Sequence, residues 1–284
     1  MAHAVSDLGA VAALYARAGF TVGARNRHAS AWGTQNQIVQ LPGFFVELLA
    51  MADVSAIAPH ADRYFSFGAF NRDFLARRQG LSMLVLEGYD SAAEAEAFRA
   101  VGIGDFELYN FERDAKRPDG TPTKVAFSLA FARDRKAPDI GYFTCKQLYP
   151  ANFWNPAFQH HANSAVGIAG AVLVADNPGE HHAFLSAFTG ERDVRTIATG
   201  ISVKTPRGEI QVMDPASVAR HFGVSPPDTQ RGARLTALRF VVRDMAVARL
   251  ALQSGEIDFA EQSQRLVVGP DIAFGATLVF ESAG

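Results

Sequence analysis

Apolar residues recur at helical spacing in four stretches of the chain, each bracketed by a capping residue and a glycine. In the first stretch, Leu8, Val11 and Leu14 share one face of a helix that runs from Asp7 to Gly19. The other three helices are predicted in the same way, from Ser91 to Gly102, from Asn177 to Gly190 and from Asp244 to Gly255. Ser91 and Glu94 have the spacing of a capping box, in which each side chain bonds a free backbone N–H. One helix therefore recurs in each quarter of the chain.

Short apolar runs of β type flank these helices. A strand candidate precedes three of the four, at residues 81–87, 166–175 and 235–242. Further runs follow each helix, at residues 20–24, 36–41 and 44–51, then 106–111 and 123–132, then 196–204 and 209–213, and finally 264–268 and 272–281. The repeated unit is a strand, a helix and two or three strands, so we predict four βαβββ units. Only six residues precede Asp7, so the first strand is either short or begins upstream of the recorded start.

The repeat predicts the fold class and the domain organisation. One helix over a few antiparallel strands buries a single face of the sheet and leaves the other face free. Four units predict an α+β fold of two domains, whose curved, mostly antiparallel sheets each enclose a cleft for a small molecule. We place the first domain at residues 1–135 and the second at 165–284. The connector between them, residues 136–164, begins within the polar run 134–139.

Composition excludes several classes of function. The net charge is −2 with no basic run, so nothing attracts nucleic acid or an anionic membrane surface. No stretch approaches the roughly 20 apolar residues of a membrane-spanning helix. The one cysteine, Cys145, excludes an internal disulfide framework, and the N-terminus lacks the features of a signal peptide. We expect a cytoplasmic protein.

Several local motifs resemble the vicinal-oxygen-chelate superfamily of glyoxalases, bleomycin-resistance proteins and dioxygenases, in particular its glyoxalase-like branch. The matching stretches are Tyr15–Val22, Arg27–His28 with Trp32–Asn36, Phe45–Leu49, Phe143–Gln147, Asn152–Pro156 and Gln159–Asn163. The resemblance implies a two-domain protein with a small-molecule substrate or ligand. Relatives often pair units between chains, so a homodimer is possible, although four units in one chain can also pair internally.

The resemblance also implies a divalent metal held by His and Glu residues on the first and last strands of a unit. Glu47 matches the last-strand position, inside an apolar run where a carboxylate is costly to bury without a partner. It would be a metal ligand or a general base, or else an outward-facing acid on a half-exposed strand. The partner His is absent from the strand candidates 81–87, 166–175 and 235–242, and His3 lies too close to Asp7 to match. A ring-cleaving dioxygenase needs two His and a carboxylate around iron, so the sequence disfavours it, together with a four-ligand glyoxalase site.

A second group of candidates lies in the connector. His161 is suited to proton transfer near neutral pH, and Asn163, Trp154 and Gln147 join it as candidate substrate-binding residues. The alternative for His161 is a structural histidine that joins the two halves.

His28 and Asn36 are the remaining candidates. His28, beside Arg25 and Arg27, could bind a carboxylate or an oxyanion, or could lie in a solvated hairpin loop. Asn36 could orient a ligand or only end a turn.

Taken with the resemblance, these residues favour a glyoxalase-like lyase or isomerase that acts on a small polar organic molecule by proton transfer, with or without a metal. The main alternative is a binding protein without chemistry, similar to the drug-sequestering members of the superfamily, because aromatic-rich clefts bind flat ligands without catalytic groups. A purely structural role, with side chains filling the clefts, is a third possibility.

Overall fold

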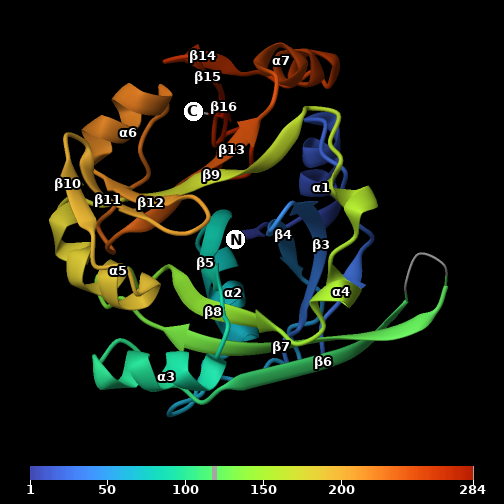
Figure 1. Cartoon of the computed structure of the whole chain (residues 1–284), viewed down its shortest axis with the longest axis vertical. Coiled ribbons are helices and arrows are strands. Elements are labelled where there is room, and N and C mark those ends of the chain that lie inside the picture. The colour runs from blue at the N-terminus through green and yellow to red at the C-terminus, as the bar shows by residue number, and fades with distance from the viewer. Residues whose placement is uncertain (117–119, 284) are drawn as a thin grey trace.

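The computed structural model describes residues 1–116 and 120–283, which form two curled eight-stranded sheets (Figure 1). The first sheet has the order β2 (Asn26–Arg27), β3 (Thr34–Leu41), β4 (Phe44–Met51), β1 (Ala2–Ala4), β5 (Gly80–Glu87), β8 (Gly141–Gln147), β7 (Pro122–Ala132) and β6 (Tyr109–Lys116). The second has the order β10 (Val194–Ile197), β11 (Gly200–Lys204), β12 (Glu209–Met213), β9 (Ala165–Val174), β13 (Arg234–Val242), β16 (Thr277–Ser282), β15 (Arg265–Val268) and β14 (Ala260–Gln262). We call the parts of the chain that build the first and second sheets the first and second halves.

Both sheets are built from two copies of the same unit. In every unit the first strand runs parallel to the last, as β1 does to β4 and β13 to β16. The first strands of the two units pair antiparallel at the centre of each sheet. A helix follows each first strand: α1 (Leu8–Arg17), α3 (Ser91–Ala100), α5 (His182–Thr189, after the 3₁₀ turn η2, Pro178–His181) and α7 (Met245–Ser254). The prediction of four βαβββ units and an α+β fold is confirmed.

The predicted capping box of α3 is shifted by one residue. Asp90, not Ser91, is the N-cap, and its side chain accepts a hydrogen bond from the N–H of Ala93. Glu94 accepts from the backbone N–H groups of Tyr89 and Asp90, while the Ser91 hydroxyl donates to the carbonyl of Ser128. The reciprocal bonding of the motif is therefore kept, with Asp90 in the role expected of Ser91.

Other differences from the sequence predictions lie between the units. Helices α2 (Phe67–Leu75) and α6 (Pro215–Phe222) were not predicted, and α4 (Pro150–Phe153) and the 3₁₀ turn η1 (Pro156–Gln159) lie in the connector. Residues 20–24 form no strand, and β16 begins only after residues 272–276. The predicted connector 136–164 contains β8, which pairs with β5 and β7, so the first sheet continues to Gln147. No helix in the described ranges is long and apolar enough to cross a membrane.

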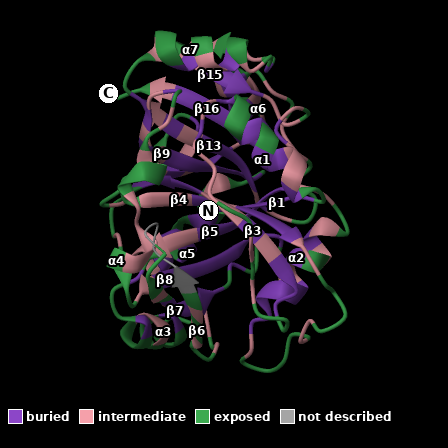
Figure 2. Ribbon diagram, turned by 90° about the vertical axis from the view of Figure 1, so that its right-hand side faces the viewer, coloured by how far each residue is buried: buried purple, intermediate pink, exposed green. Residues whose placement is uncertain are grey.

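One hydrophobic core joins the two halves. It contains Leu14 of α1, Phe98 of α3, Phe188 of α5 and Leu252 of α7 together with strand residues of both sheets. The opposite face of each sheet has a smaller core of its own, built on Phe67 of α2 in the first half and on residues of α6 in the second. Figure 2 shows the strands largely buried and the outer sides of α3 and α7 exposed. The two halves are thus held together through the sheet faces that carry α1, α3, α5 and α7. The faces that carry α2 and α6 lie outside this shared core.

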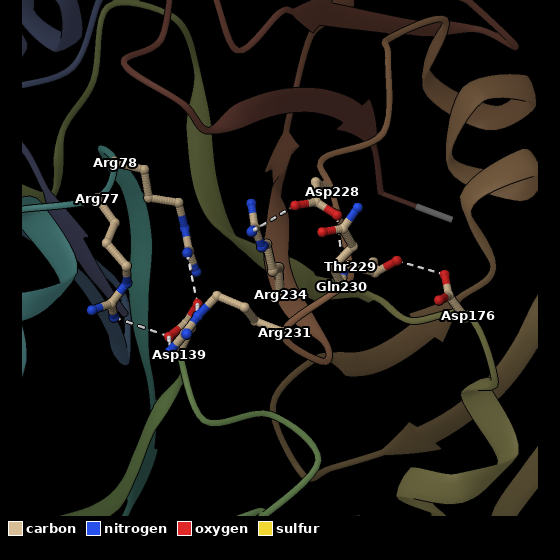
Figure 3. Close-up of polar contacts among 9 residues, drawn as sticks. All are labelled: Arg77, Arg78, Asp139, Asp176, Asp228, Thr229, Gln230, Arg231 and Arg234. Atoms are coloured by element: carbon tan, nitrogen blue, oxygen red, sulfur yellow. Dashed lines mark hydrogen bonds and ion pairs between the residues drawn. The ribbon is translucent and has the colours of Figure 1, made fainter.

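An arginine cluster around Asp139 adds a polar connection at the boundary between the halves (Figure 3). Arg77 and Arg78 follow α2 and donate to the two carboxylate oxygens of Asp139 at 2.9 and 2.8 Å. Arg231, from the second half, reaches the same carboxylate at 3.3 Å. The Asp139 side chain is only 2% exposed, so this carboxylate is a shared counter-ion for cations from both halves.

Candidate functional site

The α2 face of the first sheet contains a small cleft of about 80 Å³. Its polar lining residues are Glu47, Asn36, His28 and Arg113, together with the thiol of Cys145. The remaining walls are apolar and mostly aromatic: Met1, Trp32, Ile38, Phe45, Phe67, Val85, Phe111, Phe127, Leu129, Phe143 and Phe153. A few convergent polar groups inside a mainly apolar cavity are typical of a small-molecule site.

The β3–β4 hairpin positions Asn36 and Glu47. The turn has Pro42 and Gly43 at its centre, and Gly43 takes a φ of 74°, as the third residue of a type II turn requires. The resulting register places Ile38 opposite Glu47. Because alternate residues of a strand face the same side, Asn36 and Glu47 both point into the cleft.

Gly33 holds the loop that carries His28 and Trp32 against the sheet. Its φ is 61°, and a Cβ atom there would lie 2.2 Å from the carbonyl oxygen of Asp53. Only glycine allows this approach. Trp32 stacks on Phe67 with ring centroids 4.3 Å apart, which completes the aromatic wall beside His28.

A chain of hydrogen bonds runs from the loop to the carboxylate. The Nδ1–H of His28 donates to Thr34 Oγ1 at 2.7 Å, so Nε2 accepts from the Asn36 amide at 3.0 Å. The same amide nitrogen donates to Glu47 Oε1 at 2.6 Å. These bonds fix the tautomer of His28 and the position of the Glu47 carboxylate.

Burial sets the charge of two groups in the cleft. Desolvation lowers the pKa of His28, and Arg113 also lowers it, which outweighs the opposite effect of Glu47. His28 is therefore neutral at pH 7 and forms no ion pair with Glu47, although Nε2 and Oε1 are 3.4 Å apart. Burial raises the pKa of the Cys145 thiol to about 12, so this cysteine is protonated and a poor nucleophile.

The cleft offers an incomplete set of metal ligands. His28 Nε2 and the Glu47 carboxylate are its two usual donors, and both are already bonded to Asn36. Within residues 1–116 and 120–283, no three His, Cys, Asp or Glu side chains come together as a ligand set. Catalytic zinc sites usually take three protein ligands. The residues present therefore do not fit a resident metal of the kind implied by the resemblance.

His161 and Asn163, which the sequence analysis proposed as site residues, do not line this cleft. His161 Nδ1 accepts from the N–H of Thr21 at 3.0 Å, and Nε2–H donates to the carbonyl of Gln40 at 2.8 Å. Asn163 is fully buried and bonds the carbonyl of Ala18 and the N–H of Ala165. Both side chains use their polar atoms to fasten the connector to the backbone.

Gln147 and Trp154 line a neighbouring cavity of about 420 Å³ between the two halves. This inter-half cavity shares Met1, Phe45, Val85 and Cys145 with the cleft, so these four side chains separate the two spaces. Of the predicted site residues, Glu47, Asn36 and His28 therefore line one cleft. Gln147 and Trp154 line the adjacent inter-half cavity.

The sequence analysis missed Arg113, which lies on β6 and faces the cleft from the opposite side. Tyr109 and Phe111 alternate with polar Asn110 and Glu112, and continuing this alternation places Arg113 on the aromatic face of the strand. This was the available signal. The corresponding face of the second half differs in its charges. There Arg239 is paired with Glu209 at 3.0 Å and with Glu281 at 2.7 Å.

Comparisons with known proteins agree with this architecture. The model of the glyoxalase-like domain family matches residues 1–189. No protein with a curated description matches the chain. A hypothetical protein from Staphylococcus aureus superposes with a TM-score of 0.69 at 10% identity, over 99% of this chain and 97% of its own. A mutant of 4-hydroxymandelate synthase from Streptomyces coelicolor gives 0.58 at 11% identity, over 100% and 92% of the two chains. These structures share the fold, and on the family match the chain belongs to the glyoxalase-like domain family.

Proposed function

We propose that the cleft of the first half is the active site of an enzyme that transfers a proton on a small polar organic molecule, with Glu47 as the base. The observation that carries this proposal is the position of the Glu47 carboxylate. It is 15% exposed, faces an aromatic cavity and is held by one neutral amide. A carboxylate in such a place is costly unless it is paired and fully hydrogen-bonded, and this cost favours a functional role for Glu47.

The chemistry follows from the groups around Glu47. Among the described residues, no lysine or arginine forms an ion pair with Glu47, and its histidine neighbour is neutral. The carboxylate is therefore available to accept a proton from a carbon next to a carbonyl, and to return it to a neighbouring carbon. Asn36 keeps Oε1 in place, and His28 holds Asn36 through a neutral nitrogen. The result would be an isomerisation or, where a leaving group is expelled, a lyase reaction.

Proton exchange with solvent tests this proposal without knowledge of the natural substrate. Small 2-oxo and 2-hydroxy carbonyl compounds are incubated with the protein in D₂O, and loss of the carbon-bound proton is followed by NMR. We expect exchange with the wild type and its loss in Glu47→Gln. Glu112→Gln is the matched control, because Glu112 is exposed on β6, outside the cleft, and pairs with Lys124. Exchange that survives in Glu47→Gln removes Glu47 as the base.

A binding protein without chemistry is the second candidate, and the aromatic walls of the cleft favour it. Trp32 stacks on both Phe67 and Phe111, and its ring centroid lies 4.3 and 5.5 Å from theirs. Compounds that bind and return unaltered, with no exchange in the wild type, would support sequestration. The metal content of the wild type and of Glu47→Gln, measured in parallel, shows whether binding of any metal ion depends on Glu47.

A further inference from the structure

Arg113 enters the cleft as a cation with no counter-ion among the described residues. Its side chain is half-buried, and it forms no side-chain hydrogen bond or ion pair with any residue in the described ranges. Burial lowers the pKa of its guanidinium, but an arginine remains charged at neutral pH. A half-buried charge of this kind is costly unless a partner arrives from outside the protein.

On the corresponding face of the second half, the arginines are paired with carboxylates of the protein. Arg239 bonds two carboxylates there, and Arg265 bonds one of them, Glu281, at 2.8 Å. The charges of that face are thereby compensated within the protein. In the first half, Glu47 and Arg113 line the same cleft, but the side chain that donates a hydrogen bond to Glu47 is the neutral Asn36. The carboxylate of Glu47 and the guanidinium of Arg113 thus lie in one cleft without forming an ion pair.

Asn36 supplies a second polar requirement. Its Oδ1 atom is buried and receives no hydrogen bond from the described residues, while its nitrogen serves Glu47 and His28. A buried carbonyl oxygen without a donor is unfavourable, and a ligand hydroxyl would satisfy it. The cleft volume of about 80 Å³ is smaller than the ~150 Å³ of a cavity that holds benzene.

From these three observations, we propose that the ligand is a small carboxylate that carries a hydroxyl group. The carboxylate binds the Arg113 guanidinium, and the hydroxyl donates to Asn36 Oδ1 beside the Glu47 base. This assignment rests on the proposed function only in placing the site at this cleft. It names the substrate class for that site.

Binding of glycolate and lactate tests the assignment. It is measured by saturation-transfer NMR and by tryptophan fluorescence, to which Trp32 in the cleft contributes. Lactamide lacks the charge, and propionate lacks the hydroxyl, so both should bind more weakly than lactate. Arg113→Gln should weaken lactate binding at least about tenfold, because charge-assisted hydrogen bonds are lost. Arg133→Gln is the control, since Arg133 lies over the Phe106 ring outside the cleft.

Each outcome decides the assignment. Equal affinity for lactate and lactamide, failure of both hydroxy acids to bind, or full affinity in Arg113→Gln would overturn it. Should Arg113→Gln not fold, Arg113→Lys keeps the charge without the planar fork, and an unchanged lactate affinity there refutes the paired contact. Lactate bound without proton exchange leaves the carboxylate site standing and removes the base. Proton exchange that is limited to neutral carbonyl compounds and unaffected by Arg113→Gln supports the Glu47 base and refutes the carboxylate site.

Discussion

The carboxylate of Asp139 gives the most direct test of how the halves are joined. Burial alone would raise its pKa, but the hydrogen bonds from Arg78 and Arg231 and the charges of Arg78 and Arg77 outweigh burial and lower the pKa from 3.8 to about 2. Replacement of Asp139 by Asn removes the shared counter-ion of these cations (Figure 3). We expect the variant to be less stable at neutral pH.

The size of the effect follows from the pKa difference between the folded and unfolded states. A carboxylate whose folded pKa is lowered stabilises the protein above its unfolded pKa, and this contribution disappears as the pH falls towards the folded pKa. A difference of nearly two units corresponds to about 2 kcal/mol at pH 7 and about 1 kcal/mol at pH 3. The gap between wild type and Asp139→Asn should therefore close between about pH 4 and pH 2.

Urea unfolding followed by tryptophan fluorescence measures this gap at pH 7 and at steps down to pH 3. The control is Asp193→Asn, because Asp193 also pairs with an arginine, Arg195, but both side chains are exposed. Its unfolding midpoint should stay at the wild-type value. A difference below about 0.5 kcal/mol for Asp139→Asn at pH 7 would refute the counter-ion role. A gap that stays constant down to pH 3 would assign the loss to packing instead of charge.

Three further predictions concern buried groups. Burial lowers the pKa of His3 from 6.5 to about 4, so its contribution to stability is present above pH 6.5 and falls by about 3 kcal/mol towards pH 4. His3→Gln should flatten this pH dependence in the same unfolding assay, and an unchanged slope would contradict the burial argument. Cys145, with its raised pKa, should react with iodoacetamide at pH 8 far more slowly in the native protein than in urea, and equal rates would show an accessible thiolate. Gly33→Ala should cost about 1–3 kcal/mol, whereas Gly102→Ala, also at positive φ (73°) but with no atom within 4 Å of its Cβ, should cost less; equal losses would mean that the contact with Asp53 is unimportant.

The sequence by itself determined the repeated unit, because the signals that define it are local. The cap at Asp7 and the left-handed glycine after α5, Gly190, are read from a few neighbouring residues, and the structure has helices at both places. The apolar run around Glu47 likewise marked a strand with one carboxylate among buried residues. Helix α2 was missed, because no predicted strand directly precedes its N-cap Ser66, whereas one precedes three of the four predicted helices.

Only the tertiary structure decided which polar residues share a site. His161 lies 140 residues from Thr21 in the chain, and its ring nitrogens are bonded there and to Gln40, so its role depends on where the connector returns to the first half. Arg113 and Glu47 line the same cleft only because β6 and β4 belong to one curled sheet. Pairing over such separations depends on strand order and sheet curvature, which no short pattern of residues records.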